Sequence, residues 1–253
     1  MVETKQPQKI SAIIQARMGS TRLPGKVLTH ILQKPVIWHI IERLKFSKLI
    51  NQIVLAIPNT PENDMLEQFA REHSIACYRG SEQEVLNRVY FAAKDQGSDV
   101  IVEIPADKPL IDPGIIDEAI SAHVSSGADY TDTSYPARVL PLGLDVAVFN
   151  FNALEVAYQK AQDPYHRENV TSYFYENPNM FKLNSIKIPE HLKKPEMRLT
   201  LDTKEDLELI TNIYENLYKE GKLFKTDEVL KLKKKKPNLK AINAHIIQKS
   251  RSI

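Results

Sequence analysis

The stretch Ile13-Ile14-Gln15-Ala16-Arg17-Met18-Gly19-Ser20-Thr21-Arg22-Leu23-Pro24-Gly25-Lys26 decides the fold class of this 253-residue chain. Its apolar beginning predicts a buried strand over residues 10–16, and the glycines and the proline that follow interrupt any regular continuation. The loop then carries three cations, Arg17, Arg22 and Lys26. Guanidinium and ammonium groups beside backbone amides suit a polyphosphate. The stretch predicts a strand followed by a phosphate-binding loop, with a plain basic surface loop as the alternative.

Neither of the two common phosphate-binding motifs fits this loop. Five residues separate Gly19 from Gly25, and Val27 follows Lys26 where a P-loop requires a Ser or Thr hydroxyl for magnesium. The dinucleotide pattern G-x-G-x-x-G is also absent. An ordinary P-loop ATPase is therefore disfavoured, and any metal would need carboxylates from elsewhere in the chain.

The composition is that of an ordinary soluble globular protein, with 42% hydrophobic and 26% charged residues. No apolar run approaches the ~20 residues that span a bilayer, and the first nine residues lack the apolar core of a signal peptide. Cys77 is the only cysteine, which excludes an intrachain disulfide and favours a cytoplasmic location.

The formal net charge of +2 gives no reason to expect a nucleic-acid partner. The one strongly basic run, Lys231 to Lys236, is predicted to be a solvated helix face or a fraying tail. A nucleic-acid or phospholipid patch is the weaker reading, because no aromatic residue follows Phe224. We expect neither nucleic acid nor a membrane as a partner.

Strand-like and helix-like patterns alternate along the first half of the chain. Strands are predicted at residues 53–57, 75–78 and 99–104, and helices at residues 36–44, 65–71, from a Ser81–Glu84 capping box to about 96, and from Asp112-Pro113 to about 127. This alternation predicts a mainly parallel sheet with helices on both faces.

The rhythm changes in the second half. Strands are predicted at residues 130–133, 146–149 and 182–188, and helices at residues 151–161, 168–176 and from a Thr203–Asp206 cap to Glu220, ended by Gly221. We interpret residues 1–253 as one nucleotide-binding domain, in which segment 130–190 forms a small inserted substrate and dimerisation lobe. We expect a homodimer.

Open α/β sheets bind ligands at the carboxyl ends of their strands. This rule brings the loop after the first strand, residues 79–81, residues 105–109 and Asp202 to one rim. Magnesium prefers one or two carboxylates together with phosphate oxygens and water. Asp107 and Asp202 are the candidates; the alternative is that Asp107 makes a turn and Asp202 helps to cap a helix. The Asp-Pro context of Asp112 is explained by helix capping alone.

Several motifs together resemble the spore-coat-polysaccharide (SpsF-type) cytidylyltransferases, relatives of the enzymes that make CMP-sialic acid and CMP-Kdo. These motifs are residues 15–28, Tyr78-Arg79-Gly80-Ser81, Asp107-Lys108-Pro109-Leu110-Ile111-Asp112-Pro113, Gly143-Leu144-Asp145-Val146 and Leu201-Asp202-Thr203-Lys204-Glu205-Asp206-Leu207. The resemblance covers most of the chain in the expected order. It implies a Rossmann-like three-layer α/β/α nucleotide-diphospho-sugar transferase fold with a mainly parallel, mixed sheet.

The resemblance also implies roles for individual residues. Aspartates at the positions of Asp107 and Asp202 hold the catalytic Mg²⁺ in such families. Arg22 and Lys26 would grip the β- and γ-phosphates, and Arg17 would bind the α-phosphate or the nucleotide more generally. The other predicted nucleotide-binding residues are Ala16, Gly19, Ser20, Arg79, Gly80, Ser81 and Ala106. The predicted residues of the acceptor pocket are Arg138, Gly143, Asp145, His166 and Arg167, of which His166 could equally be a helix-start residue on the surface.

The segment before Pro109 departs from the family pattern. Relatives usually have Arg-x-Thr-Gly-Asp-Cys where this chain has Glu103-Ile104-Pro105-Ala106-Asp107-Lys108. Lys108 could pair with Asp107, meet a phosphate or point away. We predict a magnesium-dependent cytidylyltransferase that couples CTP to a small acidic sugar or phosphorylated acceptor and releases pyrophosphate, for surface polysaccharide or envelope biosynthesis. The alternatives are a glycosyltransferase of the same fold, which would favour a D-x-D motif, and a nucleotide-binding protein that has lost catalysis.

Overall fold

A seven-stranded sheet in the order β5-β4-β1-β6-β8-β7-β9 forms the centre of the computed structural model, which describes residues 8–248. The strands are β1 (Ile10–Gln15), β4 (Gln52–Pro58), β5 (Ala76–Gly80), β6 (Val100–Pro105), β7 (Tyr130–Asp132), β8 (Ala147–Asn150) and β9 (Leu183–Asn184). Strands β5, β4, β1 and β6 run parallel, β8 is antiparallel to β6 and β7, and β9 is parallel to β7. The sheet is therefore mixed and mainly parallel, as predicted.

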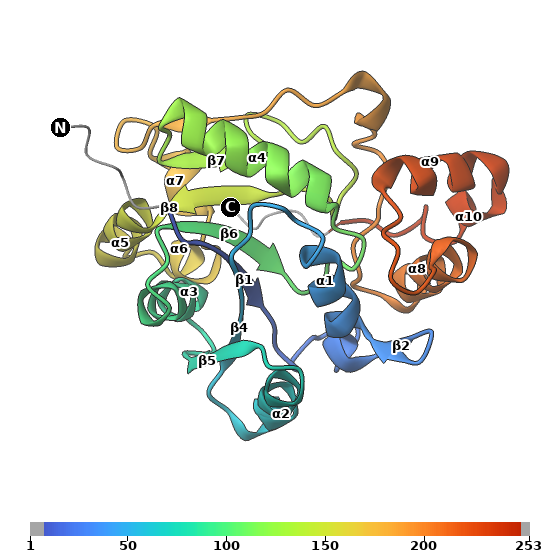
Figure 1. The fold of residues 1–253 in the computed structure, drawn as a ribbon, viewed down its shortest axis with the longest axis horizontal. Helices are drawn as coiled ribbons and strands as arrows, with labels where there is room; N and C mark the ends of the chain where they lie inside the picture. Colours follow the sequence, from blue (N-terminus) through green and yellow to red (C-terminus); the bar gives the residue numbers. More distant parts are fainter. Residues whose placement is uncertain (1–7, 249–253) are drawn as a thin grey trace.

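Helices cover both faces of this sheet (Figure 1). They are α1 (Val36–Leu44), α2 (Asp64–Glu72), α3 (Val85–Asp95), α4 (Pro113–Ser126), α5 (Phe151–Lys160), α6 (Pro164–Glu168), α7 (Ser172–Glu176), α8 (Lys204–Leu217), α9 (Thr226–Lys235) and α10 (Asn238–Ala241). Three short 3₁₀ turns, η1 (Lys26–Leu28), η2 (Pro61–Asn63) and η3 (Glu190–Leu192), and a small hairpin of β2 (His30–Ile31) and β3 (Lys34–Pro35) complete the chain.

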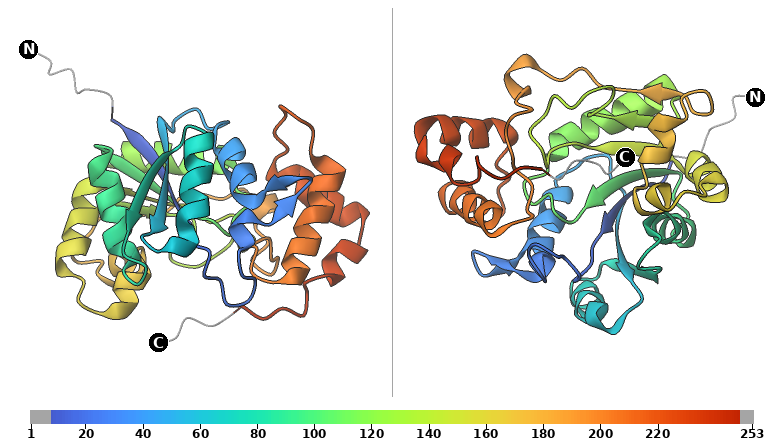
Figure 2. Two further views of the ribbon diagram at one scale, coloured as in Figure 1. Left: turned by 90° about the horizontal axis from the view of Figure 1, so that it is seen from below. Right: turned by 180° about the vertical axis from the view of Figure 1, so that it is seen from behind.

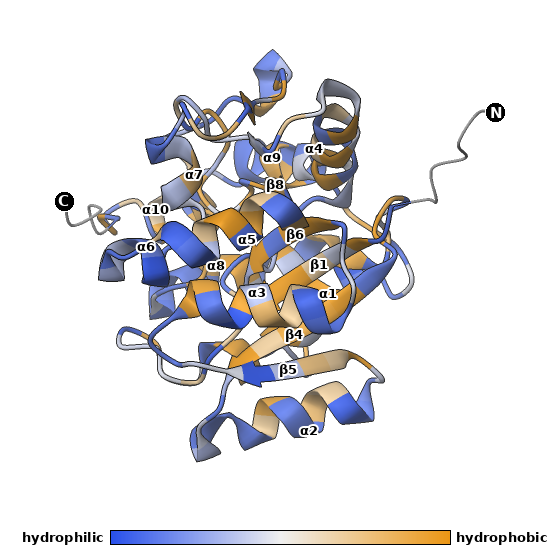
Figure 3. Cartoon of the chain, turned by 90° about the vertical axis from the view of Figure 1, so that its left-hand side faces the viewer, coloured by the Kyte–Doolittle hydropathy of each residue, from blue (hydrophilic) through white to orange (hydrophobic). Residues whose placement is uncertain are grey.

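The alternating side chains of β1 show why three layers form. Ile14 belongs to the core that includes α1, α2 and α4, while Ile13 belongs to the core that includes α3, α5 and α7. Both side chains are fully buried, as a parallel strand covered on both faces requires. Figure 3 shows the hydrophobic strands lying between helices whose outer faces are hydrophilic. The predicted three-layer α/β/α fold is confirmed.

Two predicted helix starts are confirmed by their caps. Asp112 accepts a hydrogen bond from the Gly114 amide at 2.9 Å, and Pro113 takes the first position of α4, which Gly127 ends at φ +59°. Thr203 and Asp206 form a reciprocal capping box at the start of α8.

Four predicted boundaries are wrong. Helix α3 begins at Val85 rather than at the Ser81 cap, although Ser81 Oγ accepts a hydrogen bond from the Glu84 amide at 3.0 Å. The helix predicted at 168–176 is divided into α6 and α7, since a second Asp-Pro start at residues 163–164 begins α6 earlier. The strand predicted at 182–188 is only β9, and α8 ends at Leu217 because Tyr218 is extended.

Segment 130–190, predicted as a small inserted lobe, supplies three strands of the main sheet, β7, β8 and β9. Its predicted part in dimerisation stays a prediction. A different group stands beside the sheet instead: α8, α9 and α10 lie together at one side of the molecule, next to α1 (Figures 1 and 2).

The basic run on α9 is only partly the solvated face that we predicted. Lys231, Lys234 and Lys235 are exposed, whereas Lys233 is buried with 3% of its surface accessible. The prediction was wrong for Lys233 because α9 packs one of its faces against neighbouring segments. Within residues 8–248, no helix is long and apolar enough to cross a membrane.

Candidate active site

The loop after β1 is closed by its own backbone. The Met18 carbonyl accepts hydrogen bonds from the amides of Ser20, at 2.8 Å, and Gly25, at 3.0 Å. Gly25 adopts φ +69° at the start of η1, a conformation that favours glycine. The fully buried Asn63 accepts a hydrogen bond from the Met18 amide at 3.0 Å and so fastens the loop to η2. These contacts hold the cationic part of the loop over the end of the sheet.

Lys26 lies between the two predicted metal ligands. Its Nζ donates to Asp202 Oδ1 at 2.8 Å and to the Leu201 carbonyl at 2.8 Å, and it lies 3.7 Å from Asp107 Oδ2. Arg22 Nη2 lies 2.9 Å from the other oxygen of Asp202. Residues far apart in the sequence thus meet as a cluster of two cations and two carboxylates, as the rule of the carboxyl edge predicted.

Backbone contacts bring the two aspartates together. The carbonyl of Asp107, just after β6, accepts a hydrogen bond from the Leu201 amide at 2.8 Å. Asp202 is fixed from behind by Arg198, whose Nη2 lies 3.0 Å from Oδ2. Arg198 also donates two hydrogen bonds to Asp206, at 2.8 and 2.7 Å. We did not predict this role for Arg198; its only signal in the sequence is a cation placed four residues before Asp202.

The two aspartates differ in their protonation behaviour. Burial raises the pKa of Asp107, and neighbouring Lys26 only partly opposes this while the charge of Asp202 adds to it. Burial also acts to raise the pKa of Asp202, but Lys26, Arg22 and Arg198 outweigh it and hold that pKa below its ordinary value. Asp202 is therefore a carboxylate already matched by cations, and Asp107 is the one that gains most from further positive charge.

A cavity of about 290 Å³ opens at the carboxyl ends of β1 and β6. Seven predicted site residues line it: Arg17, Ser20, Arg22, Lys26, Ala106, Asp107 and Asp202. Gln15 and Thr21, which we had quoted in the motif but given no role, also line it. Arg17 is exposed there and forms no ion pair within residues 8–248.

The other predicted nucleotide-binding residues do not line this cavity. Ala16 is buried and continues the sheet, its amide donating to the Ala56 carbonyl at 3.2 Å. Gly19 is exposed in the loop. Arg79 is engaged by α2, with its Nη1 lying 2.7 Å from Asp64 and 2.6 Å from Glu67.

Gly80 and Ser81 follow at the end of β5. A Cβ at Gly80 would lie 2.9 Å from the Tyr78 ring and 3.1 Å from Arg88, so close packing explains this glycine. The Ser81 carbonyl accepts a hydrogen bond from Arg88. The predicted contacts of Arg79, Gly80 and Ser81 with a nucleotide stay predictions.

Lys108 points away from Asp107. Its Nζ donates to Asp145 Oδ2 at 2.6 Å and to the Asp145 carbonyl at 2.7 Å, and the side chain is buried. Asp145 also accepts from the Gly143 amide at 3.3 Å. Gly143 has φ +98°, and a Cβ there would lie 2.7 Å from the Thr200 amide nitrogen. The unusual lysine thus fixes a predicted acceptor-pocket residue.

Glu103 is a buried acid behind the cavity that we did not predict. It accepts a hydrogen bond from Gln15 Nε2, and Gln15 lines the cavity. Burial raises the pKa of Glu103 to about 7, although Lys108 opposes the shift, while Asp132 and Asp145 add to it. Only a contact between two strands that are far apart in the sequence reveals this group, because Glu103 stands in an otherwise apolar β6.

The remaining predicted acceptor residues lie outside the cavity. His166 Nε2 lies 2.8 Å from Glu176, and Arg167 makes a two-pronged ion pair with Glu84 at 3.0 Å for each nitrogen. Arg138 is exposed in the loop before β8 and forms no ion pair within the described part of the chain. Of these three predicted acceptor residues, only Arg138 keeps a free charge.

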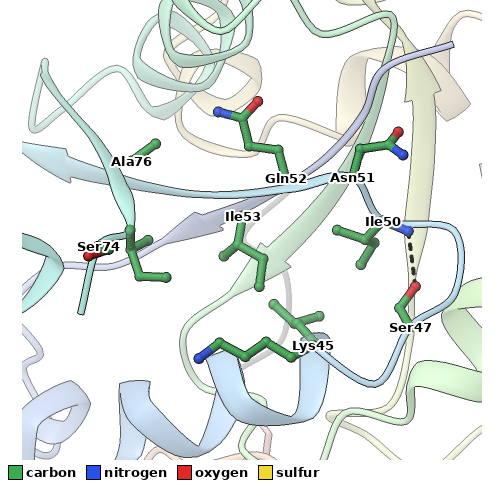
Figure 4. Close-up of a pocket in the computed structure, with 10 residues that line it drawn as sticks. Lys45, Ser47, Ile50, Asn51, Gln52, Ile53, Ser74 and Ala76 are labelled. Carbon is green, nitrogen blue, oxygen red and sulfur yellow. Dashed lines mark hydrogen bonds between the residues drawn. The ribbon is translucent and has the colours of Figure 1, made fainter.

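A separate cavity of about 400 Å³ lies at the opposite edge of the sheet, where β4 and β5 begin (Figure 4). Lys45 is the charged side chain of its lining, and Lys45 already pairs with Glu42 at 2.6 Å. This cavity brings together no acid, base or cation cluster, so the carboxyl edge remains the candidate active site.

Comparisons with known proteins identify the family of the chain. Residues 11–230 match the sequence model of a family described as Cytidylyltransferase. An uncharacterized protein of Methanocaldococcus jannaschii is 38% identical over 244 residues, which cover 96% of this chain and 97% of that protein. The spore coat polysaccharide biosynthesis protein SpsF of Bacillus subtilis is 35% identical over 208 residues, which cover 80% of this chain and 85% of that protein.

Solved structures show the same similarity. A cytidylyltransferase from Leptospira borgpetersenii superimposes with a TM-score of 0.86 at 30% identity and covers 95% of this chain and 99% of its own. A CMP-2-keto-3-deoxy-manno-octonic acid synthetase complexed with CTP has a TM-score of 0.64 at 15% identity, over 83% of this chain and 99% of its own, which shows a shared fold.

Proposed function

Because the chain belongs to the cytidylyltransferase family and is a nucleotidyltransferase, we propose that it couples CTP to a small acidic acceptor with the help of Mg²⁺. The acceptor is an acidic sugar or a phosphorylated molecule, and the CMP-activated product serves surface polysaccharide or envelope biosynthesis. The single observation that carries this proposal is the meeting of Arg22 and Lys26 with Asp107 and Asp202 in one cavity.

The donor set at the centre of the cavity suits magnesium. Asp107 and Asp202 offer hard carboxylate oxygens, and both already face a positive charge, the ammonium group of Lys26. Within residues 8–248 no group of three or more acidic, histidine or cysteine side chains could hold a metal. Two carboxylates completed by phosphate oxygens and water match the usual magnesium site. When bound, the ion would neutralise charge on the phosphates and polarise the α-phosphoryl group.

The cations of the loop would bind and orient the triphosphate. Arg17 is free to meet a phosphate, and Arg22 and Lys26 would exchange part of their contact with Asp202 for phosphate oxygens. In the reaction an acceptor oxygen forms a bond to the α-phosphorus. At the same time the bond breaks between that phosphorus and the oxygen that joins the α- and β-phosphates, and this oxygen leaves with pyrophosphate. The departing pyrophosphate carries the developing charge, which Arg22 and Lys26 are placed to stabilise.

Names of relatives support the class of acceptor. The relative from Bacillus subtilis is named for spore coat polysaccharide biosynthesis, and several relatives that match just under half of the chain are named 3-deoxy-manno-octulosonate cytidylyltransferases. Outside the cavity, the exposed cation of Arg138 would attract an acidic acceptor, and Lys108 would hold Asp145 in a fixed position.

The direct test is release of pyrophosphate from CTP in the presence of Mg²⁺ and a panel of acidic sugars and phosphorylated acceptors, with ATP, GTP and UTP as alternative donors. Of the four nucleotides, we expect only CTP to support turnover, and we expect no pyrophosphate release when the acceptor is omitted. Tight CTP binding without turnover on any acceptor would instead support a nucleotide-binding protein. A sugar nucleotide consumed as the donor would support a glycosyltransferase.

Single substitutions test the metal assignment. Asp107→Asn and Asp202→Asn should each abolish metal-dependent turnover, whereas Asp95→Asn, at the far end of α3, should leave it unchanged. Near-normal rates in both site variants would refute the assignment of these aspartates as magnesium ligands.

A further inference from the structure

A third cavity, of about 880 Å³, lies between α9, α10 and the segment that leads from η3 to Arg198. Five lysines line it, Lys194, Lys231, Lys233, Lys234 and Lys240, against two acids, Glu196 and Asp227. Asp227 is already paired with His191, at 2.9 Å. None of the five lysines forms an ion pair within residues 8–248, so the lining carries a strong excess of positive charge.

Lys233 is the most informative member of this group. Only 3% of its surface is accessible, and within residues 8–248 its ammonium group has no hydrogen bond or ion pair. Burial together with the nearby charge of Lys240 lowers the pKa of Lys233 to about 8, because partial loss of hydration disfavours the charged form. Lys233 lines the cavity together with four other lysines.

The cavity is separate from the candidate active site. The two share no lining residue, and they meet through Arg198, which lines the lysine-rich cavity while its guanidinium group binds Asp202 and Asp206. Met197, Leu230 and Ile246 complete the wall with apolar surface. The volume falls within the ~300–1,000 Å³ typical of small-molecule sites.

We propose that this cavity binds a small, multiply charged phosphate-bearing molecule, with Lys233 and Lys240 as its central contacts. Lysine is suited to phosphate as a compact point charge, and several lysines around one cavity favour more than one negative charge on the ligand. The bound anion would supply the partner that Lys233 lacks.

The test is isothermal titration of the full-length protein with inorganic pyrophosphate in the absence of divalent cations. Lys233→Met removes the buried charge and keeps the length of the side chain. Lys235→Met is the matched control, since Lys235 lies on the same helix, is exposed and does not line the cavity. We expect Lys233→Met to lose one binding event or to weaken it at least about tenfold, while Lys235→Met binds as the unaltered protein does. Because only these two variants are compared, pyrophosphate bound elsewhere does not affect the result.

Equal pyrophosphate binding by Lys233→Met and Lys235→Met, within about twofold, would overturn the proposal. Thermal unfolding of each variant checks that the fold is kept; should Lys233→Met fail to fold, Lys240→Met, an exposed lysine of the same cavity, replaces it. Sedimentation with phosphatidylglycerol vesicles distinguishes a lipid headgroup as the source of phosphate. Vesicle binding that depends on Lys233, without binding of pyrophosphate, would also overturn the proposal of a small soluble ligand.

Discussion

Replacing Glu103 by Gln should raise the free energy of unfolding strongly at pH 8 and only slightly at pH 5. Glu103 is buried behind Gln15, which donates a hydrogen bond to it, and it faces Lys108, Asp132 and Asp145. A glutamine has nearly the same shape and can still accept the hydrogen bond from Gln15 through its amide oxygen. The substitution therefore removes the ionisation of this side chain while keeping its packing.

The magnitude follows from the pKa of Glu103, which burial raises from 4.5 to about 7. Between these two values the folded protein keeps a proton on Glu103 that the unfolded chain has released. The stabilising contribution of Glu103 is therefore complete below pH 4.5 and is lost as the pH rises to about 7. The difference between the two pKa values corresponds to about 3 kcal/mol of folding stability, and glutamine, which does not ionise, does not incur this loss.

Denaturant unfolding at pH 5 and pH 8 measures the effect. The free energy of unfolding of Glu103→Gln, relative to the unaltered protein, should rise by about 2.5 kcal/mol across this interval, since a small part of the effect is already present at pH 5. Glu118→Gln, at an exposed position on α4, is the control and should show no such change with pH. An equal difference at both values of pH would refute the reasoning, since it would mean that Glu103 is ionised in the folded protein at pH 5 and that Lys108 fully compensates its burial.

Three further substitutions have expected outcomes. Arg22→Ala should lower kcat/KM for CTP by roughly 100-fold, about 3 kcal/mol of transition-state stabilisation, in a pyrophosphate-release assay; activity within about twofold would exclude it from the phosphate clamp. Gly143→Ala should destabilise the protein by clearly more than Gly97→Ala in thermal unfolding, because both have positive φ but only Gly143 would bring a Cβ within 2.7 Å of backbone; equal costs would contradict this. Lys108→Met should cost about 3 kcal/mol in denaturant unfolding at neutral pH, as it leaves Asp145 without its cation, and an unchanged midpoint would show that the pair is not needed.

The sequence was sufficient wherever the signal is local. The Asp112-Pro113 start and the Thr203–Asp206 box predict helix ends because each cap joins residues three or fewer positions apart. The order of the parallel strands then places the loop after β1 beside Asp107, because the carboxyl ends of parallel strands share one edge. Asp202 follows none of the strands in the described part of the chain, so its meeting with Lys26 across 176 positions depends instead on the hydrogen bond from the Leu201 amide to the Asp107 carbonyl.

The remaining features depend on contacts that no local pattern encodes. Asn63 fastens the loop through Met18, and Glu103 meets Gln15 across two neighbouring strands. Lys233 belongs to a basic run that is typical of a solvated face, and only the packing of α9 buries it. In each case the role of a polar residue depends on whether a segment distant in the sequence supplies it with a partner.

The charges of the candidate active site give an independent reason to expect a divalent cation. The cavity holds three cations, Arg17, Arg22 and Lys26, and two carboxylates, Asp107 and Asp202, which leaves a net charge of only +1 (three minus two). A nucleoside triphosphate brings considerably more negative charge than this, and two of the cations are already engaged by Asp202. The loop lacks the hydroxyl that a P-loop uses for magnesium. A divalent cation at this edge of the sheet would therefore take its protein ligands from the carboxylate oxygens of Asp107 and Asp202.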